Sequence, residues 1–291
     1  MRNGIVGAAA AMFLVGTLAG VAGLVDSYPI YGGQAVRYLV ASVILLVITR
    51  ALGLRFVRLA PRDLLCLAGL TLLGLVVFNV AVVESTRASG PALVGTVLGT
   101  VPLALALAGG RPAPRLLLGA GVVVTGATLA TGLGSGTTES LLWALAALVG
   151  EVSFSLLAIP LLPKLGPIRV SAYSTALAVP MLAVVGLVTE GAGMFRTPTV
   201  PEVLGFTYLA IVVTVIAFFL WYSSLPKLGP GRAGLFAGLI PVAAIVTGAV
   251  LGVAMPTAYD LLGAGLVVVG ILVGLSAERS SAKAAVRPSE A

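Results

Sequence analysis

The sequence predicts an all-α membrane protein, and three observations support this. Of its 291 residues, 59% are hydrophobic and 9% are charged, whereas a typical soluble domain is about 25% charged. Apolar runs recur along the chain at about the 20-residue length that a helix needs to cross a bilayer. These runs show no alternating pattern of the kind that a membrane β-barrel requires. Basic residues, finally, gather in alternate loops between the runs.

Ten apolar runs are long enough to span the membrane. We expect transmembrane helices at residues 4–25, 30–49, 64–84, 91–109, 116–133, 141–162, 170–188, 203–223, 233–253 and 260–277. The first run also resembles a secretory signal, with Arg2 as its charged end. Its length and the lack of a clean cleavage site before Asp26 favour a retained helix.

The distribution of basic residues predicts the orientation. With ten spans threaded in order, 14 of the 17 Lys and Arg residues fall on one side of the membrane. These are Arg2, Arg50, Arg55, Arg58, Arg62, Arg111, Arg115, Lys164, Arg169, Lys227, Arg232, Arg279, Lys283 and Arg287. Arg87 and Arg196 fall on the other side, and Arg37 lies within a span. Because basic loops stay on the cytoplasmic side, we expect both termini to be cytoplasmic in a multi-pass protein of the cell (inner or plasma) membrane.

One phrase of Gly and Pro residues occurs twice. GPALVGTVLGTVP at residues 90–102 matches GPGRAGLFAGLIP at residues 229–241 in the positions of all five shared Gly and Pro residues. Further on, PAPRLLLGAGVVVTG at 112–126 matches PTAYDLLGAGLVVVG at 256–270. This self-similarity predicts an internal duplication.

The repeat unit contains five spans, and an odd number of spans inverts the second copy relative to the first. We therefore expect two inverted five-helix repeats, at residues 1–133 and 134–277, followed by a polar cytoplasmic tail at 278–291. Equivalent loops also carry opposite charge bias, as inversion requires. Inverted repeats are characteristic of secondary transporters, in which two copies of one shape exchange conformations around a central site.

Within the repeated phrase, two features suggest a role in gating. Gly95 and Gly99, like Gly234 and Gly238, form a small-xxx-small face that lets neighbouring backbones approach closely. Pro102 and Pro241 lie mid-span, where the lost backbone hydrogen bond kinks a helix or leaves it lining a cavity. A packing role and a hinge role both fit these six residues.

The order of motifs resembles the EamA group of the drug/metabolite transporter (DMT) superfamily. TYLAIVVTVIAFFLWYSSLPKLGPGRAGLFAGLIPVAAIVTGAVLG and LLGAGLVVVGILV are similar to the end of that fold, and PIYGGQAVRYLVASVILL and FNVAVVESTRASGPALVGTVLGTVPLALAL to its second to fourth helices. The resemblance covers nearly all of residues 4–277. It implies ten helices in two inverted repeats, and the movement of small metabolites, often amino acids, commonly outward across the bacterial inner membrane.

The chain also departs from the family pattern. An acidic residue often follows a glycine after the fourth and ninth helices, but none occurs near Gly110 or at Val253. Val15 stands where a tryptophan before Gly16 is usual. The resemblance therefore supports the predicted fold more strongly than it supports a particular coupling ion or substrate.

Glu151 is the leading candidate for a substrate or coupling-ion contact. It lies ten residues into the span 141–162, which at 1.5 Å per residue is about 15 Å deep. A charged group at that depth is costly, so it is a functional hypothesis by default. Glu151 could carry a coupling proton, contact a substrate amine, or be a protonated side chain hydrogen-bonded to a neighbouring helix.

Three further polar residues belong to the candidate site. Glu84 and Arg87 lie three residues apart, a spacing that favours an ion pair on one helix face. Arg37, near the outer end of its span, could extend toward the headgroups or pair with Glu84 or Asp26. The family resemblance implies a structural or gating role for it. Asn79 has both a donor and an acceptor and could line the cavity or join two helices.

Three apolar-span residues have structural interpretations. Trp221 and Tyr222 are expected in an interfacial aromatic belt. Cys66, the only cysteine, is expected to be a small packing residue and permits no internal disulfide.

The absence of certain residues narrows the function. The sequence has no histidine, which excludes a Ser-His or Cys-His catalytic pair and His-based metal sites. No Walker A motif occurs, so ATP is not the direct energy source.

We therefore expect a non-enzymatic transporter without cofactor or metal that binds a small-molecule substrate within the lipid bilayer, with protons as a candidate coupling ion and no nucleic-acid partner. The sequence does not define an oligomeric state. An intramembrane enzyme using Glu151 and Asp26, and a membrane partner protein without flux, are the alternatives.

Overall fold

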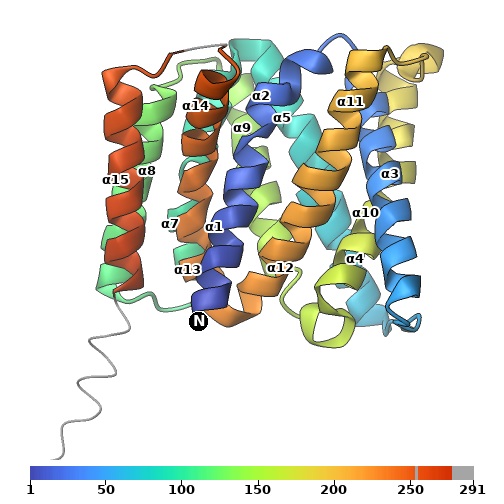
Figure 1. Ribbon diagram of the computed structural model, residues 1–291, viewed down its shortest axis with the longest axis horizontal. Coiled ribbons are helices and arrows are strands. Elements are labelled where there is room, and N and C mark those ends of the chain that lie inside the picture. The colour runs from blue at the N-terminus through green and yellow to red at the C-terminus, as the bar shows by residue number, and fades with distance from the viewer. Residues whose placement is uncertain (253–254, 277–291) are drawn as a thin grey trace, which may run out of the picture.

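A computed structural model describes residues 1–252 and 255–276 of the chain. Val253 and the predicted tail at 278–291 lie outside the described residues. Ten helices in the described part are long and apolar enough to cross a membrane. They run alternately up and down, so that the N-terminus and the end of the last helix lie at one face, the lower face in Figure 1. The prediction of an all-α protein with ten spans is confirmed.

The first five spans comprise ten short or long helical elements. They are α1 (Arg2–Gly16), α2 (Leu18–Val21) and η1 (Ala22–Leu24); α3 (Ile30–Ala51); α4 (Pro61–Thr71), η2 (Leu72–Val77) and α5 (Phe78–Ser89); α6 (Pro91–Leu98) and α7 (Val101–Ala108); and α8 (Pro114–Thr131). Only α3 and α8 form their spans alone. The third span extends past the predicted end at residue 84, because the polar end of α5 continues the helix as far as Ser89.

The last five spans are similarly segmented. They are α9 (Thr138–Leu156); α10 (Leu162–Thr189), followed by η3 (Gly191–Met194); α11 (Val200–Tyr208), η4 (Leu209–Ile216) and α12 (Ala217–Leu228); α13 (Pro230–Leu235), η5 (Phe236–Gly238) and α14 (Leu239–Val250); and α15 (Ala258–Leu275). The backbone of α10 is interrupted at Gly166, whose φ of 69° is left-handed. The regular part of α10 therefore begins at Pro167.

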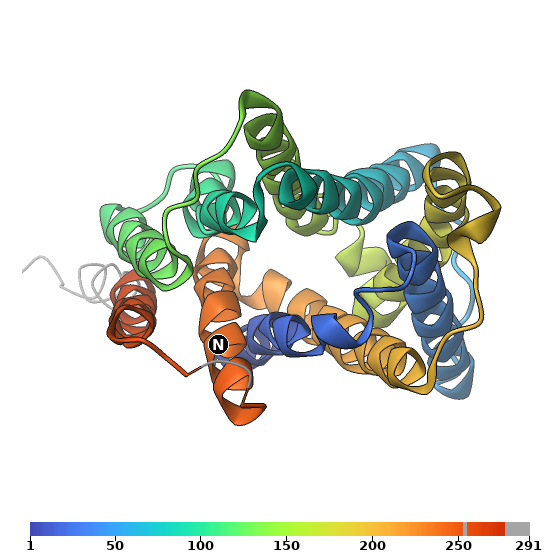
Figure 2. The same cartoon turned by 90° about the horizontal axis from the view of Figure 1, so that it is seen from above.

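The helices of the two halves of the chain pack against each other. Seen from above, α8 and α15 lie together at one end of the molecule, and α3 and α10 lie together at the other (Figure 2). Between these ends, α1 packs on α12 and α14, and α5 packs on α9. One large buried core of apolar side chains from both halves fills the centre. Cys66 packs at the margin of this core, in agreement with its predicted role.

A close, reciprocal backbone contact joins α8 and α15. A Cβ atom added to Gly119 would lie 2.7 Å from the carbonyl oxygen of Gly270, and one added to Gly270 would lie 2.7 Å from that of Gly119. Gly126 and Gly263 oppose each other in the same way, at 2.7 and 2.6 Å. Only glycine permits this approach, because any side chain would collide with the facing backbone.

The close packing predicted at the glycines of the repeated phrase is found at Gly234 and Gly238 but not at Gly95. A Cβ atom at Gly95 would have only ordinary contacts with Thr131, at 3.9 Å. At Gly234 it would lie 2.8 Å from Cβ of Leu105, and at Gly238 closer still to Cγ1 of Val123, so these two glycines face side chains of the other half at close range. The tight backbone contact lies one helix further along each half, because the packed surfaces of α8 and α15 carry the other glycine motif.

Candidate functional site

A chain of polar side chains crosses the interior from α3 to α5. Asn79 of α5 donates a hydrogen bond of 3.1 Å from its Nδ2 atom to the hydroxyl of Tyr38 on α3. The same amide donates to the carbonyl oxygen of Leu75, one turn earlier, at 2.5 Å. Tyr38 itself is buried. Asn79 thus makes the helix–helix hydrogen bond that was one of its two predicted roles.

Arg37 lies on the adjacent position of α3 and is buried. Its Nε atom donates to the hydroxyl of Thr214 at 2.8 Å, and an Nη atom donates to Oε1 of Gln34 at 3.3 Å. The guanidinium also lies 5.4 Å from the centre of the Tyr38 ring, within range of a cation–π contact.

The predicted orientation of Arg37 toward the headgroups is wrong, and so is its pairing with Glu84 or Asp26. Its side chain is 6% exposed and forms no ion pair with a carboxylate of the described residues. The reason lies in the partner helix. The widened π-helical turn η4 presents the Thr214 hydroxyl, which donates to the carbonyl oxygen of Leu209 and accepts from Arg37. The guanidinium is therefore satisfied inside the bundle.

An aromatic cluster lies nearer the lower ends of α9 and α12. The rings of Phe154, Phe218 and Tyr222 are 4.8 to 6.2 Å apart, centre to centre. Trp221 and Tyr222 are 2% and 0% exposed, so the prediction that they belong to an interfacial belt is wrong. They face the core because α12 packs with this side against α1 and α10.

Four buried polar atoms have no hydrogen-bond partner among the described residues. They are the Tyr222 hydroxyl, the Trp221 indole nitrogen, the Ser155 hydroxyl and, on α10, the Tyr173 hydroxyl. Buried polar groups are normally paired, and an orphaned group needs an explanation. Such groups are available to a bound polar molecule.

Glu151 lies beside this cluster, on the same helix as Phe154. It is partly buried and within electrostatic range of Tyr222, which is in turn within range of Tyr38. Because α9 ends at Leu156, Glu151 lies five residues from its end rather than near the middle of the span as predicted. Asp26 is exposed in the loop at the opposite face, so the two acids of the enzyme hypothesis are not brought together.

A second polar group lies at the upper face. Glu84 accepts a hydrogen bond of 2.7 Å from the Tyr31 hydroxyl and pairs with Arg87 at 3.0 Å. The predicted Glu84–Arg87 ion pair is confirmed. Directly after α10, the carboxylate of Glu190 accepts from the backbone N–H groups of Tyr31 and Gly32, both at 3.0 Å. Glu84, near the end of α5 at the upper face, is thus separate from Glu151, near the lower end of α9.

Four of the six predicted hinge residues lie at or beside interruptions of their helices, whereas Gly95 and Gly234 lie within α6 and α13. In the fourth span, α6 ends at Leu98 and α7 begins at Val101, so that Gly99 lies in the break and Pro102 just after it. In the ninth span, the 3-10 segment η5 ends at Gly238, shortly before Pro241. A proline lacks the N–H that would continue the helix, which accounts for a break at this point.

Sequence reasoning missed most of the partners of these residues. Thr214, Gln34, Tyr31 and Glu190 are common side chains in or beside apolar spans, and their sequence positions alone carry no distinctive signal. Glu202 had a signal. It follows Thr199 by three residues at the start of a span, which is the capping-box spacing.

Ten apolar helices enclosing a partly polar interior define a multi-pass membrane protein. The model of the EamA-like transporter family matches residues 138–275. The second half of the chain therefore matches that family.

Two similar proteins extend the comparison beyond the matched region. "Uncharacterized transporter YetK" of Bacillus subtilis (strain 168) is 26% identical over 278 residues, which cover 91% of this chain and 84% of that protein. A solved crystal structure superimposes with a TM-score of 0.83 over 96% of this chain and 99% of the solved chain, at 21% identity. At that identity the solved structure speaks only for the fold. Family and relative together identify a membrane transporter.

Proposed function

We propose that this protein is a secondary active transporter of the cell membrane that exports small metabolites such as amino acids. It works by alternating access between two inverted five-helix repeats, with both termini in the cytoplasm. The substrate lies between the repeats, and protons are the candidate coupling ion. Export and cytoplasmic termini rest on the family resemblance and on the basic loops at the lower face.

The observation that carries the proposal is the reciprocal contact of α8 and α15. In the repeat alignment, Gly119 corresponds to Gly263 and Gly126 to Gly270. Gly119 packs on Gly270, and Gly126 packs on Gly263. Gly119 thus contacts the counterpart of Gly126, and Gly126 contacts the counterpart of Gly119. A two-fold axis in the membrane plane produces this reciprocal pattern.

The interruptions of the helices support the same relationship. The third and eighth spans each contain a π-helical segment, η2 and η4. Each then ends at a glycine with left-handed backbone, Gly90 (φ 76°, ψ 173°) or Gly229 (φ 74°, ψ 161°), followed by a proline that begins the next helix. The same interruptions at equivalent positions are expected if the two halves are copies of one moving unit.

For the substrate, we propose a binding position among Glu151, Tyr222 and the neighbouring aromatic rings. A carboxylate fits an amine, and the rings fit an apolar body or contribute cation–π contacts. We place Arg37 outside this binding position. Its partner Thr214 and the neighbour of Glu151, Tyr222, are eight residues apart, which is about 12 Å along a helix. Arg37 instead has a structural or gating role.

Flux measurements on proteoliposomes test the proposal. A screen for resistance to amino acids and toxic analogues in overproducing cells first selects the substrate. We then expect uptake driven by a substrate or pH gradient that is lost in Glu151→Gln and retained in Glu151→Asp. If both variants keep proton-driven flux, Glu151 is not the coupling residue. Turnover of a lipid substrate in detergent, without a second compartment, would favour an intramembrane enzyme.

A labelling map tests the inverted repeats. In a Cys66→Ala background, single cysteines introduced in residues 85–90 and 224–231 should react from opposite sides of the membrane. Labelling of both segments from the same side would contradict the inverted arrangement and the proposed mechanism with it.

A further inference from the structure

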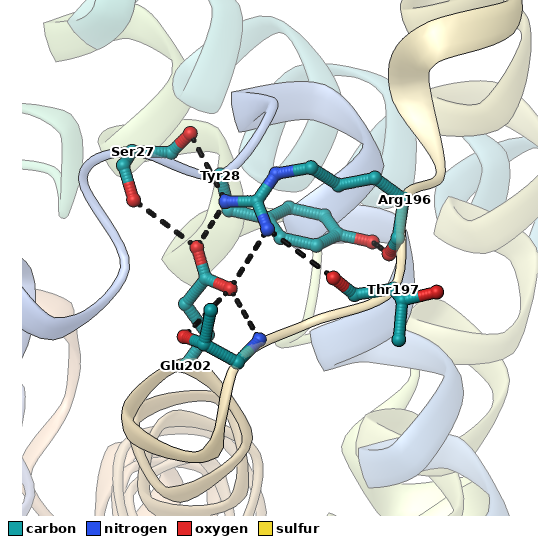
Figure 3. A network of polar contacts seen from close by, with 6 residues as sticks. Ser27, Tyr28, Arg196, Thr197 and Glu202 are labelled. Atoms are coloured by element: carbon teal, nitrogen blue, oxygen red, sulfur yellow. Dashed lines mark hydrogen bonds and ion pairs between the residues drawn. The ribbon is translucent and has the colours of Figure 1, made fainter.

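Glu202 joins the two halves of the chain at the upper face. It is the third residue of α11, and its carboxylate is almost completely buried. It accepts a hydrogen bond of 3.1 Å from the hydroxyl of Ser27, in the linker between the first two spans. It also pairs with Arg196, which in turn donates to the backbone carbonyl of Ser27 at 3.3 Å. Figure 3 shows this arrangement, with the Arg196 guanidinium between Ser27 and Glu202.

Further contacts hold the Arg196 side chain in place. Its guanidinium lies 4.8 Å from the centre of the Tyr28 ring. The Tyr28 hydroxyl donates to the backbone carbonyl of Arg196 at 2.9 Å. Glu202 in addition accepts from the backbone N–H and the hydroxyl of Thr199, at 2.7 and 3.0 Å. We call Ser27, Tyr28, Arg196, Thr199 and Glu202 the upper latch.

A second acid joins the halves at the lower face. Asp63 is the third residue of α4 and is 8% exposed. Both of its carboxylate oxygens accept from the Nζ atom of Lys164, at 2.8 and 2.7 Å. Lys164 precedes the interruption of α10 at Gly166, in the connection between the sixth and seventh spans. We call this pair the lower latch.

The two latches are equivalent in the duplicated sequence. Asp63 and Glu202 are separated by the same 139 residues as the two Gly-Pro phrases, and each lies in the first turn of the third span of its half. Each contacts the connection between the first two spans of the other half. Because α4 begins at the lower face and α11 at the upper face, the contacts lie on opposite sides (Figure 1).

We infer that Asp63 and Glu202 are paired gate residues, whose contacts break in alternation as the transporter opens to one side and then to the other. This inference rests on the proposed alternating-access function. A rocking motion separates the two halves at one face while they stay together at the other. Contacts that bridge the halves at the rim of each face must therefore be made and broken in each cycle.

The latches differ in strength. The Lys164 and Asp63 side chains are 54% and 11% exposed, and an ion pair open to water contributes little. In the upper latch the acid is 2% exposed and accepts several hydrogen bonds, which are costly to leave unmade. The upper face therefore stays closed more of the time, and the lower face opens more readily.

Distance measurements between spin labels test this inference without a known substrate. Labels at positions 26 and 200 span the upper latch, and labels at 62 and 163 span the lower one. All four positions are exposed. The protein is placed in nanodiscs of phosphatidylethanolamine and phosphatidylglycerol, with Cys66→Ala as the background.

In Glu202→Gln we expect the ratio of long to short distances across the upper latch to rise about ten-fold, because a buried acceptor of charged hydrogen bonds is lost. The lower distance should stay the same or become shorter. Asp63→Asn should lengthen only the lower distance, and by less. Ser27→Ala/Arg196→Gln should reproduce the Glu202→Gln result while keeping the contact of Glu202 with Thr199.

Asp260→Asn is the matched control. Asp260 is also the third residue of its helix, and it accepts hydrogen bonds from Thr257 in a capping box within its own half. Its substitution should change neither distance. Unchanged upper distances in both Glu202→Gln and Ser27→Ala/Arg196→Gln would overturn the inference, as would simultaneous lengthening at both faces.

The two proposals fail separately. If the distances respond as expected but no gradient-driven flux is found, the latches control opening at the two faces and the proposal of transport is wrong. If Glu151→Gln abolishes flux while the latch variants leave every distance unchanged, the transport proposal stands and the latches fall.

Discussion

Gly119 of α8 and Gly270 of α15 face each other so closely that each would place a Cβ atom 2.7 Å from the other's carbonyl oxygen. The contact depends on the absence of side chains at both positions. In a membrane, where lipid tails are as apolar as the helices, such backbone packing is a main source of helix association.

We therefore expect Gly119→Ala to destabilise the protein by about 1–3 kcal/mol, the usual cost of overpacking a close contact. A thermal unfolding measurement in detergent checks this. Gly121→Ala is the matched control on the same helix, because a Cβ atom there meets nothing within 4 Å. Equal melting temperatures for the two variants would show that the α8–α15 contact does not contribute to stability.

The sequence was sufficient for the number and order of the helices, because hydropathy and alternate charged loops depend on the membrane rather than on tertiary contacts. It was not sufficient to tell which face of a helix is buried. Trp221 and Tyr222 are residue types that are common in an interfacial aromatic belt, yet both are buried in the core. A nearly apolar helix has no polar stripe that marks its outer face. Its neighbouring helices therefore decide which of its side chains are buried.

Interior polar contacts were likewise only partly predictable. The Glu84–Arg87 pair follows from local spacing on one helix. Arg37 could not be placed in this way, because its partner Thr214 is 177 residues away along the chain and is presented by a π-helical turn. The correspondence between Asp63 and Glu202 is visible only when the alignment of the two halves is extended from the repeated glycines and prolines to the rest of the sequence.

The contact between Arg37 and Thr214 gives a second prediction. Thr214→Val keeps the shape of the side chain but leaves the buried Nε atom of Arg37 without its acceptor, so we expect destabilisation by about 1–3 kcal/mol. In an Arg37→Met background the same substitution should cost much less. A double-mutant cycle of melting temperatures measures this coupling. Additive effects of the two substitutions would mean that the hydrogen bond does not stabilise the fold.

The unpartnered hydroxyl of Tyr222 gives a third prediction. Tyr222→Phe removes a buried oxygen that has no hydrogen-bond partner among the described residues, so stability should stay the same or rise by up to about 1 kcal/mol. If this hydroxyl contacts the substrate, flux into proteoliposomes should fall in the same variant. Tyr31→Phe is the comparison, because it loses a 2.7 Å hydrogen bond to Glu84 and should lower stability. A Tyr222→Phe variant with unaltered flux would exclude the hydroxyl from the binding position.

The prolines at the two helix interruptions give the last prediction. Pro102→Ala restores a backbone N–H just after the break between α6 and α7, and so permits the hydrogen bond that would join them. We expect a higher melting temperature together with a lower maximal rate of flux, because a continuous helix bends less readily. Pro241→Ala should act in the same direction at the equivalent break. Pro114→Ala is the control, since Pro114 is the first residue of α8, where the N–H has no partner within the helix. A hinge moves during transport and a rigid kink does not, so the maximal rate of flux distinguishes the two roles. An unchanged maximal rate in both Pro102→Ala and Pro241→Ala would assign these prolines to packing alone.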